Sequence, residues 1–161
     1  MNRALPVAAV TGALVVTAAG ASLAAVGAHR LSHQQQLDAA RASALAAGRQ
    51  IAVDVASYDY RTIDADFTRV SKEATGKFQS DFTTQSAGVR DAIVAAKAVS
   101  SAQVASAGVV NASPTSAQVV VALNRTVTNS QAPKGTQSAL GVQLFLVKRG
   151  DRWLATDVKP L

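Results

Sequence analysis

Two neighbouring acids, Asp64 and Asp66, are the first candidates for general acid–base chemistry in this chain. They lie in the stretch SYDYRTIDADFTRVSKEATGKFQSDF, residues 57–82. Residues two apart on a helix point in different directions, so these carboxylates cannot share one substrate bond. The exposed N–H groups of a helix start favour acids in the first turn, and we interpret the pair as helix-start charges.

The only two histidines, His29 and His33, are four residues apart and could face together as metal ligands. No carboxylate stands near them before Asp38. We therefore interpret them as polar residues at a membrane interface. The chain has no cysteine, which excludes disulfides, thiolate catalysis and cysteine zinc sites.

The sequence contains no visible nucleophile–base pair, no glycine-rich phosphate loop and no metal-ligand set. Asp157 and Tyr60 are the only candidates for an acid or base inside a folded domain. We predict that the protein is not an enzyme and uses no cofactor. The net charge is +6, but the basic residues form no run and have no aromatic residues between them, so nucleic-acid binding is not supported.

Residues 4–28, ALPVAAVTGALVVTAAGASLAAVGA, carry no charge. A helix of that length exceeds the ~30 Å hydrocarbon core of a membrane. We predict a transmembrane anchor over residues 1–28, with the N-terminus in the cytoplasm and the rest of the chain extracytoplasmic. A cleaved signal peptide is the alternative, although the run is long for an apolar region of about 7–15 residues.

A helical stalk is predicted over residues 29–57. Small and apolar residues recur there at steps of three and four, which defines one narrow helical stripe. The members of this stripe are Leu37, Ala40, Ala44, Gly48, Ile51, Val55 and Tyr58. An Ala/Gly seam brings a partner close, and that partner is either the protein's own sheet or a second chain. The oligomeric state stays open.

Residues 58–161 are predicted to form an α+β domain. A helix starts at Thr62 or Asp64 and Gly76 is read as its stop, after which another helix fits residues 86–100. Beyond Ser101 apolar residues recur with a period of two. About four strands are expected, over residues 102–111, 117–128, 140–149 and 151–160. Helices followed by such a meander predict a curved antiparallel sheet with helices against its concave face.

Most of the large rings lie where the stalk meets this domain. In a chain so rich in Ala, rings of this size should supply most of the buried area at the junction, and we expect them to be core. The same stretch offers a docking edge. The predicted junction and docking residues are Tyr58, Tyr60, Arg61, Asp64, Asp66, Phe67, Gly76, Phe78 and Phe82.

The segments SYDYRTIDADFTRV and ATGKFQSDF, followed by a strand-rich half ending RWLATDVKPL, resemble the Mce-associated membrane proteins of high-GC Gram-positive bacteria. The resemblance implies a single-pass protein of the cytoplasmic membrane with a cone-shaped domain of the nuclear-transport-factor (cystatin-like) type. It also implies a non-catalytic role beside Mce complexes, which import lipids and sterols.

The leading functional prediction is accordingly an accessory protein that supports assembly or stability of an Mce-type lipid or sterol importer. Its partners would be Mce subunits or other envelope membrane proteins, and membrane lipid. One alternative is an extracytoplasmic lipid- or sterol-binding carrier, which needs an apolar cavity inside the cone. A second alternative is the single-span component of a type IV secretion system, which has a similar cone. The fold alone does not fix the partner.

Overall fold

The computed structural model describes residues 11–161, with side chains described from residue 30 onward. Contacts divide the chain into two compact units, Met1–Asp38 and Ala39–Leu161. The predicted anchor, residues 1–28, lies outside the residues whose side chains are described. Within the part that is described, no helix has the length and apolarity needed to cross a membrane.

Helix α1 runs without a break from Thr11 to Ala56. Alanine, the best helix former, dominates its sequence. In the second unit, the predicted stripe is buried at Ala40, Ala44 and Ile51. The small side chains of Ala40 and Ala44 let the sheet approach closely, and a Cβ added at Gly48 would lie 2.9 Å from a methyl group of Val119.

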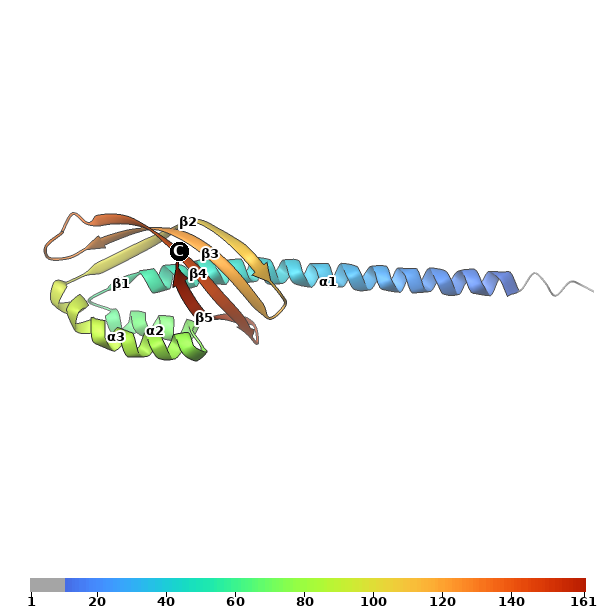
Figure 1. Ribbon diagram of the computed structural model, residues 1–161, viewed down its shortest axis with the longest axis horizontal. Helices are drawn as coiled ribbons and strands as arrows, with labels where there is room; N and C mark the ends of the chain where they lie inside the picture. The colour runs from blue at the N-terminus through green and yellow to red at the C-terminus, as the bar shows by residue number, and fades with distance from the viewer. Residues whose placement is uncertain (1–10) are drawn as a thin grey trace, which may run out of the picture. The chain divides into compact units, whose positions relative to one another are not determined.

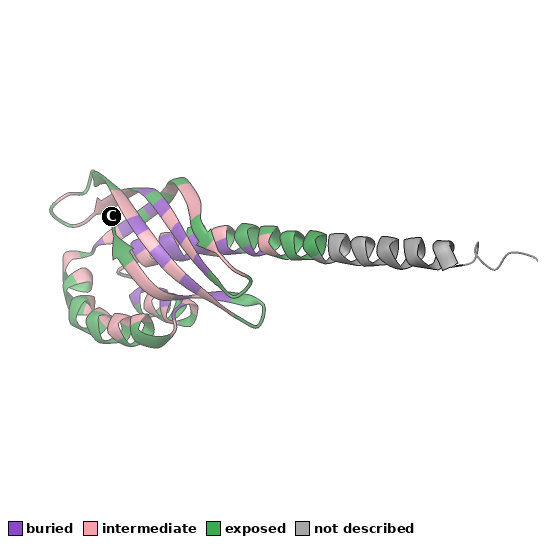
Figure 2. Cartoon of the chain, turned by 45° about the vertical axis from the view of Figure 1, so that its right-hand side comes forward, coloured by how far each residue is buried: buried purple, intermediate pink, exposed green. Residues whose placement is uncertain are grey.

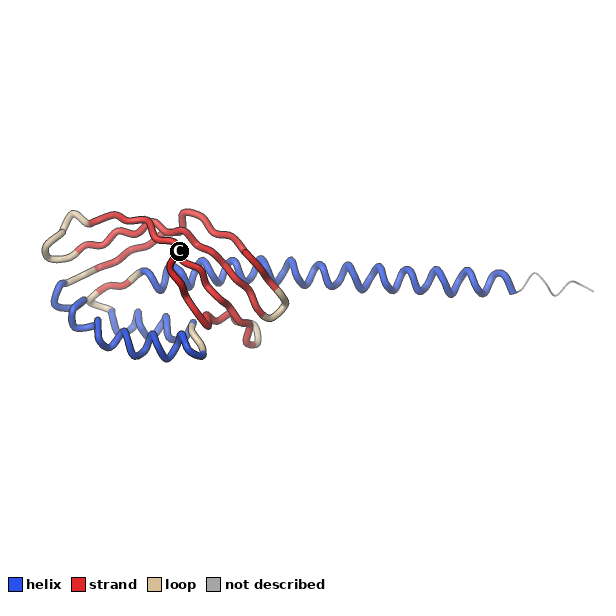
Figure 3. The backbone as a smooth tube through the Cα atoms, in the orientation of Figure 1, coloured by secondary structure: helices blue, strands red, loops and turns tan. Residues whose placement is uncertain are grey.

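The sheet has five antiparallel strands in the order β1-β2-β3-β4-β5 (Figure 3). They are β1 Tyr58–Asp59, β2 Val99–Ala112, β3 Ser116–Thr128, β4 Thr136–Arg149 and β5 Arg152–Pro160. The four long strands confirm the prediction from period-two patterning. The two-residue β1 was not predicted, so the expected number of about four strands becomes five.

Alternation along the strands builds the core (Figure 2). Val119, Val121 and Leu123 of β3 are buried, and so is Leu144 of β4, because successive side chains point to opposite faces and these all face α1. Trp153 of β5 joins this core, and its indole Nε1–H donates a hydrogen bond to the Ser43 hydroxyl of α1 at 3.0 Å.

Two helices connect β1 to β2: α2 spans Ile63–Glu73 and α3 spans Gly76–Ala96 (Figure 1). The prediction for this segment was partly wrong. Gly76 does not end a helix but opens α3 with a φ of +59°, and the helix expected over residues 86–100 runs instead from Gly76 to Ala96. The Thr75 N–H between the helices donates to the Ala155 carbonyl, so this link lies along the outer edge of β5.

Candidate functional site

The two acids at the start of α2 hold the local fold together. Asp66, only 7% exposed, accepts hydrogen bonds from the backbone N–H of Asp59 at 2.9 Å and from the Thr62 hydroxyl at 3.1 Å. Asp64 is exposed and binds the guanidinium of Arg90 in α3 at 2.6 and 2.9 Å, which holds the pKa of Asp64 below its usual value. The two carboxylates therefore face different partners, and neither is available to act on a substrate together with the other.

Strand β1 and the residues after it form an elbow that is half-buried at Tyr58–Tyr60 and exposed at Arg61. The Asp59 carboxylate accepts hydrogen bonds from the backbone N–H and the guanidinium Nε of Arg61, both at 2.9 Å. These bonds lower the pKa of Asp59. The Arg61 guanidinium lies 5.7 Å from the centre of the Tyr60 ring, while Tyr58 pairs with Ser100 of β2. Contacts between residues close in sequence therefore fix the elbow, and the Arg61 guanidinium covers one face of the Tyr60 ring.

Arg69 of α2 ties two buried carboxylates together. Its Nε donates to Asp54 of α1 at 2.8 Å and its Nη1 donates to Asp66 at 2.9 Å. Asp54 is 7% exposed and also accepts a hydrogen bond from Gln50 at 2.7 Å. This arrangement satisfies the two carboxylates inside the fold, where an unpaired charge would be strongly destabilising.

Glu73, one helical turn beyond Arg69, completes the cluster without a hydrogen-bond partner for its buried Oε2. Burial, followed by the negative charge of Asp54, raises the pKa of Glu73 to about 7. A protonated Glu73 can donate a hydrogen bond to Asp54, which removes the repulsion between the two carboxylates. Glu73 and Arg152 of β5 both line a cavity of about 620 Å³, and Arg152 donates to the Lys72 carbonyl at 2.8 Å.

The sequence reasoning missed this charged cluster, although a signal was present. Asp66, Arg69 and Glu73 are spaced three and four residues apart, which places them on one face of α2. Because the pKa of Glu73 is about 7, the charge of the cluster can change close to neutral pH. Arg69 holds Asp54 and Asp66 by ion pairs, so we interpret the cluster as a packing element whose charge depends on pH.

The aromatic residues expected in the core lie instead between α2 and α3. The rings of Phe67 and Phe82 meet edge to face with centroids 5.7 Å apart, and Phe78 lies 6.0 Å from Phe82. All three are half-buried, and Phe78 packs partly against the main core. Tyr58 and Tyr60 are also half-buried. The prediction was wrong because Val, Leu and Ala of the long strands and α1 fill the core.

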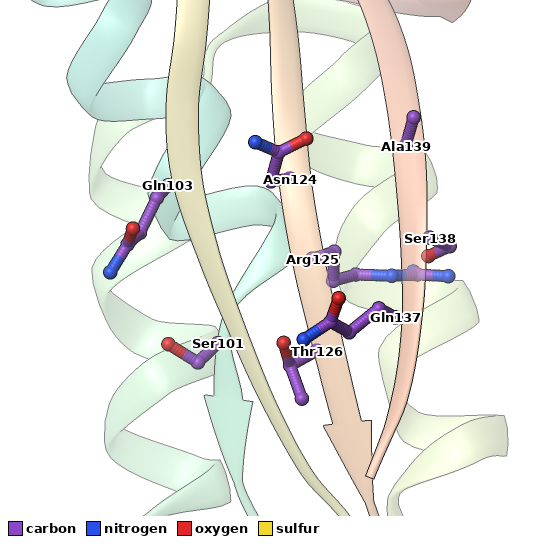
Figure 4. A pocket seen from close by; sticks show the side chains of 8 residues that line it. All are labelled: Ser101, Gln103, Asn124, Arg125, Thr126, Gln137, Ser138 and Ala139. Atoms are coloured by element: carbon purple, nitrogen blue, oxygen red, sulfur yellow. The ribbon is translucent and has the colours of Figure 1, made fainter.

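A polar cavity of about 540 Å³ lies on β2, β3 and β4 (Figure 4). Figure 4 shows Arg125 extending across β4 towards Ser138, its neighbour in the strand register. The Nε of Arg125 is buried and has no hydrogen-bond partner in the described chain. No carboxylate, imidazole or thiol lines this cavity, so its serines have no adjacent base and it offers no acid–base chemistry.

The remaining candidates do not assemble into a site. His33 is exposed, and the His29 side chain lies outside the described residues. Among the residues that are described, no group of three or more His, Cys, Asp or Glu could hold a metal ion. Asp157 is half-exposed and pairs with Lys159 at 3.4 Å, and so it does not project into the interior of the sheet.

Comparison with protein families shows where this chain has relatives. The family described as "Uncharacterized protein Rv1363c/MT1408-like" matches residues 5–152. Two Mycobacterium tuberculosis proteins are similar. Rv1363c is 29% identical over 132 residues, 81% of this chain and 49% of its own. Rv1362c is 31% identical over 136 residues, 83% of this chain and 60% of its own. The chain therefore spans between about half and three-fifths of the length of these curated relatives.

Solved structures share the fold of the domain. An IcmL-like type IV secretion system protein from Legionella pneumophila superposes with a TM-score of 0.62 at 12% identity, over 75% of this chain and 91% of that chain. The periplasmic domain of DotI gives 0.59 at 16% identity, over 74% and 94%. Agrobacterium tumefaciens VirB8 gives 0.52 at 11%, over 74% and 90%. At these identities the likeness shows the fold: a half-barrel of antiparallel strands closed by helices.

These comparisons correct the leading functional prediction, a role beside Mce transporters. The family matched is the Rv1363c/MT1408-like family, and association with Mce proteins is not shown. Among the solved structures with this fold, the Legionella pneumophila protein is described as an IcmL-like type IV secretion system protein, which agrees better with the alternative prediction of a secretion-type component. The expected fold class, a nuclear-transport-factor-like α+β domain, agrees with the same structures.

Proposed function

The chain belongs to the Rv1363c/MT1408-like family, and from this premise we propose that it is a non-catalytic assembly component of a protein complex of the cell envelope. Its folded domain would bind other envelope proteins and hold them in place. The fold shared with secretion proteins supports this proposal, but fold likeness alone does not name the partner.

The observation that carries the proposal is the filled interior of the sheet. Val119 and Leu144, at the centre of the concave face, are both 0% exposed. Helix α1 packs so closely on β3 that Gly48 leaves no space for a methyl group. A carrier of lipid or sterol needs an apolar cavity of several hundred Å³ at this place. The packing therefore counts against the carrier alternative and in favour of a rigid block with binding surfaces.

The surroundings of the candidate catalytic residues support a role without catalysis. Asp66 is used by three donors of the local fold, and Asp64 is paired with Arg90. A general acid or base must reach a substrate from a cleft with its proton free to move. Glu73 has a raised pKa, but its neighbours Asp54 and Arg69 belong to the packing between α1 and α2.

The sequence supports a location at the membrane, with the domain outside the cytoplasm. The uncharged run at residues 4–28 is long enough for an anchor. The solved structure of DotI, which has the same fold, is that of its periplasmic domain. We propose the same side for residues 39–161.

Site-specific photo-crosslinking in intact cells tests the proposal. A photoreactive residue is placed at Val89 on the exposed face of α3, and the same cells kept in the dark serve as the control. We expect discrete crosslinks from position 89 to other envelope proteins after irradiation and none in the dark. Protease added to spheroplasts should degrade residues 39–161. A chain that forms no crosslinked complex from any exposed position, or is protected from the protease, would contradict the proposal.

A further inference from the structure

Strand β2 has an outer edge that the fold leaves open. Strand β1 covers only its first residues, pairing Tyr58 with Ser100 and Asp59 with Val99. Strand β3 pairs with the other side of β2 along its length. On the β1 side, residues 103–112 therefore have no neighbouring strand in the described chain. An edge of this kind presents unpaired N–H and C=O groups that can bind an added strand.

The N–H of Ala102 shows which backbone groups of β2 point away from β3, towards the open edge. The Ala102 N–H donates to the Ser57 hydroxyl at 3.1 Å, so it points away from β3. Val104 lies two residues further along a regular stretch of the strand, and its N–H points to the same side. The bulge after Val104 and a second one after Val109 interrupt the edge, which limits any added strand to a short segment.

A groove of about 570 Å³ lies between this edge and α1. On its α1 side, the groove is lined by a second stripe of residues, which lies beside the stripe that packs on the sheet. These residues are Ala42, Leu45, Ala46, Arg49, Gln50 and Val53, and Val104 is the lining residue from β2. The distance along α1 from Ala42 to Val53 is about 16 Å, which is the length of about five extended residues. The groove therefore matches the short strand that the bulges allow.

The positive charge of Arg49 at the groove favours a partner segment with a carboxylate over a second copy of this chain. Arg49 is exposed at its rim and makes no ion pair within the described chain, and no carboxylate lines the groove. A second copy of this chain, paired edge to edge about a two-fold axis, would bring its own Arg49 to the same interface, and like charges oppose such pairing. A segment with a carboxylate would instead pair with this guanidinium.

We propose that the β2 edge and the groove beside α1 bind a short extended segment of a partner protein by strand addition. The segment is apolar at alternate positions, so that two or three side chains enter the groove between Leu45, Val53 and Val104, and it carries a carboxylate near Arg49. This inference rests on the proposed function as an assembly component, because it names the surface through which the domain binds its partner.

Binding of synthetic peptides to the purified 161-residue chain tests the proposal. The probes are acetylated peptides of about eight residues with Val at alternate positions, Ser or Thr between them, and one central Glu. A second set carries Lys in place of Glu. We expect fluorescence anisotropy to show binding of the Glu peptides about three- to fivefold tighter than the Lys peptides, the size of effect one exposed ion pair gives. Arg49→Glu should reverse that preference.

Three variants test whether the groove and the edge are the site. Ala46→Phe fills the groove and should weaken binding at least tenfold, whereas the control Ala92→Phe on the exposed surface of α3 should leave it unchanged. Val104→Pro removes an outward N–H without touching the bonds to β3, and it should also weaken binding. Peptide should slow hydrogen exchange at the Val104 amide of the unmodified chain at least tenfold. Circular dichroism checks that each variant is folded.

The outcomes separate this inference from the proposed function. Binding that survives Ala46→Phe, with no protection at Val104, overturns the inference. A dimer by light scattering that Ala46→Phe dissociates also overturns it and assigns the edge to a second copy. If crosslinked envelope complexes form in cells and survive Ala46→Phe, the proposed function stands and the inference fails. If peptides bind as expected but no envelope complex is found, the inference stands and the proposed function fails.

Discussion

Replacing Gly48 by alanine tests how closely α1 packs on the sheet. The added Cβ would lie 2.9 Å from Cγ1, 3.0 Å from Cβ and 3.2 Å from Cγ2 of Val119. Val119 is fully buried and its branched side chain has little rotamer freedom, so it cannot turn away. Either the helix must move off the sheet or the core must deform.

Two effects of opposite sign decide the magnitude. Alanine in a helix interior is more favourable than glycine by about 1 kcal/mol. Overpacking a filled core by one methyl group costs about 1–3 kcal/mol. Because Val119 meets the new atom with three of its carbons, we take the upper half of that range and expect Gly48→Ala to lower the free energy of unfolding by about 1–2 kcal/mol.

Gly88 in α3 supplies a matched control. A Cβ there would meet no atom within 4 Å, so Gly88→Ala should raise stability by about 1 kcal/mol through helix propensity alone. Urea unfolding followed by fluorescence of Trp153, the single tryptophan, measures both variants. Val119→Ala removes the 2.9 and 3.2 Å contacts with Cγ1 and Cγ2 and leaves only the 3.0 Å contact with Cβ, so Gly48→Ala should cost less when Val119→Ala is also present. Equal midpoints for the two glycine variants, or a loss at position 48 that is undiminished when Val119→Ala is also present, would refute the close packing.

Three further predictions concern the helices. Glu73→Gln should flatten the pH dependence of the free energy of unfolding. The pKa of Glu73 is raised to about 7 from an ordinary 4.5, so its stabilising contribution is full below pH 4.5 and is lost as pH rises through 7. The difference in free energy of unfolding between wild type and variant should therefore change only between these two pH values. Phe67→Ala should cost about 1–3 kcal/mol, less than a core phenylalanine, because its ring is half-buried between α2 and α3; thermal unfolding with an unchanged midpoint would contradict this packing. Lys97→Gly should raise stability by about 0.5–1 kcal/mol, since Lys97 ends α3 with a φ of +51°, and no gain in urea unfolding would argue against that backbone conformation.

The sequence was sufficient to predict the four long strands, because apolar residues recur there with a period of two. It also indicated the buried stripe of α1 by its three- and four-residue spacing. Strand β1 could not be predicted, because two residues carry no periodic signal and pair only where β2 has already formed. Gly76 was misread because a glycine with positive φ occurs at helix ends and, as here, at a helix start.

The candidate site was less accessible to sequence reasoning. The period of α2 gave the directions of Asp64 and Asp66, but their partners Asp59 and Arg90 depend on how β1 and α3 fold back. Glu73 takes its raised pKa from burial and from Asp54, a residue of another helix. The rings of the phenylalanines were expected in the core, since large apolar residues usually are, whereas small side chains on α1 let the sheet close without them. The Mce partner was inferred from a resemblance to a protein family, and a shared fold does not determine which partner a protein binds.

Every strand of this sheet pairs with the strand next to it along the chain, and this order has a consequence for how the domain forms. The hairpins β2–β3, β3–β4 and β4–β5 close short loops and should form early and fast in refolding, whereas α2 and α3 separate β1 from β2. The apolar stripe of α1 precedes them all in the chain, yet it can be covered only after β3 and β4 have paired. A nascent chain would expose that stripe to water until its last third has been made, and a holding chaperone is expected to bind there.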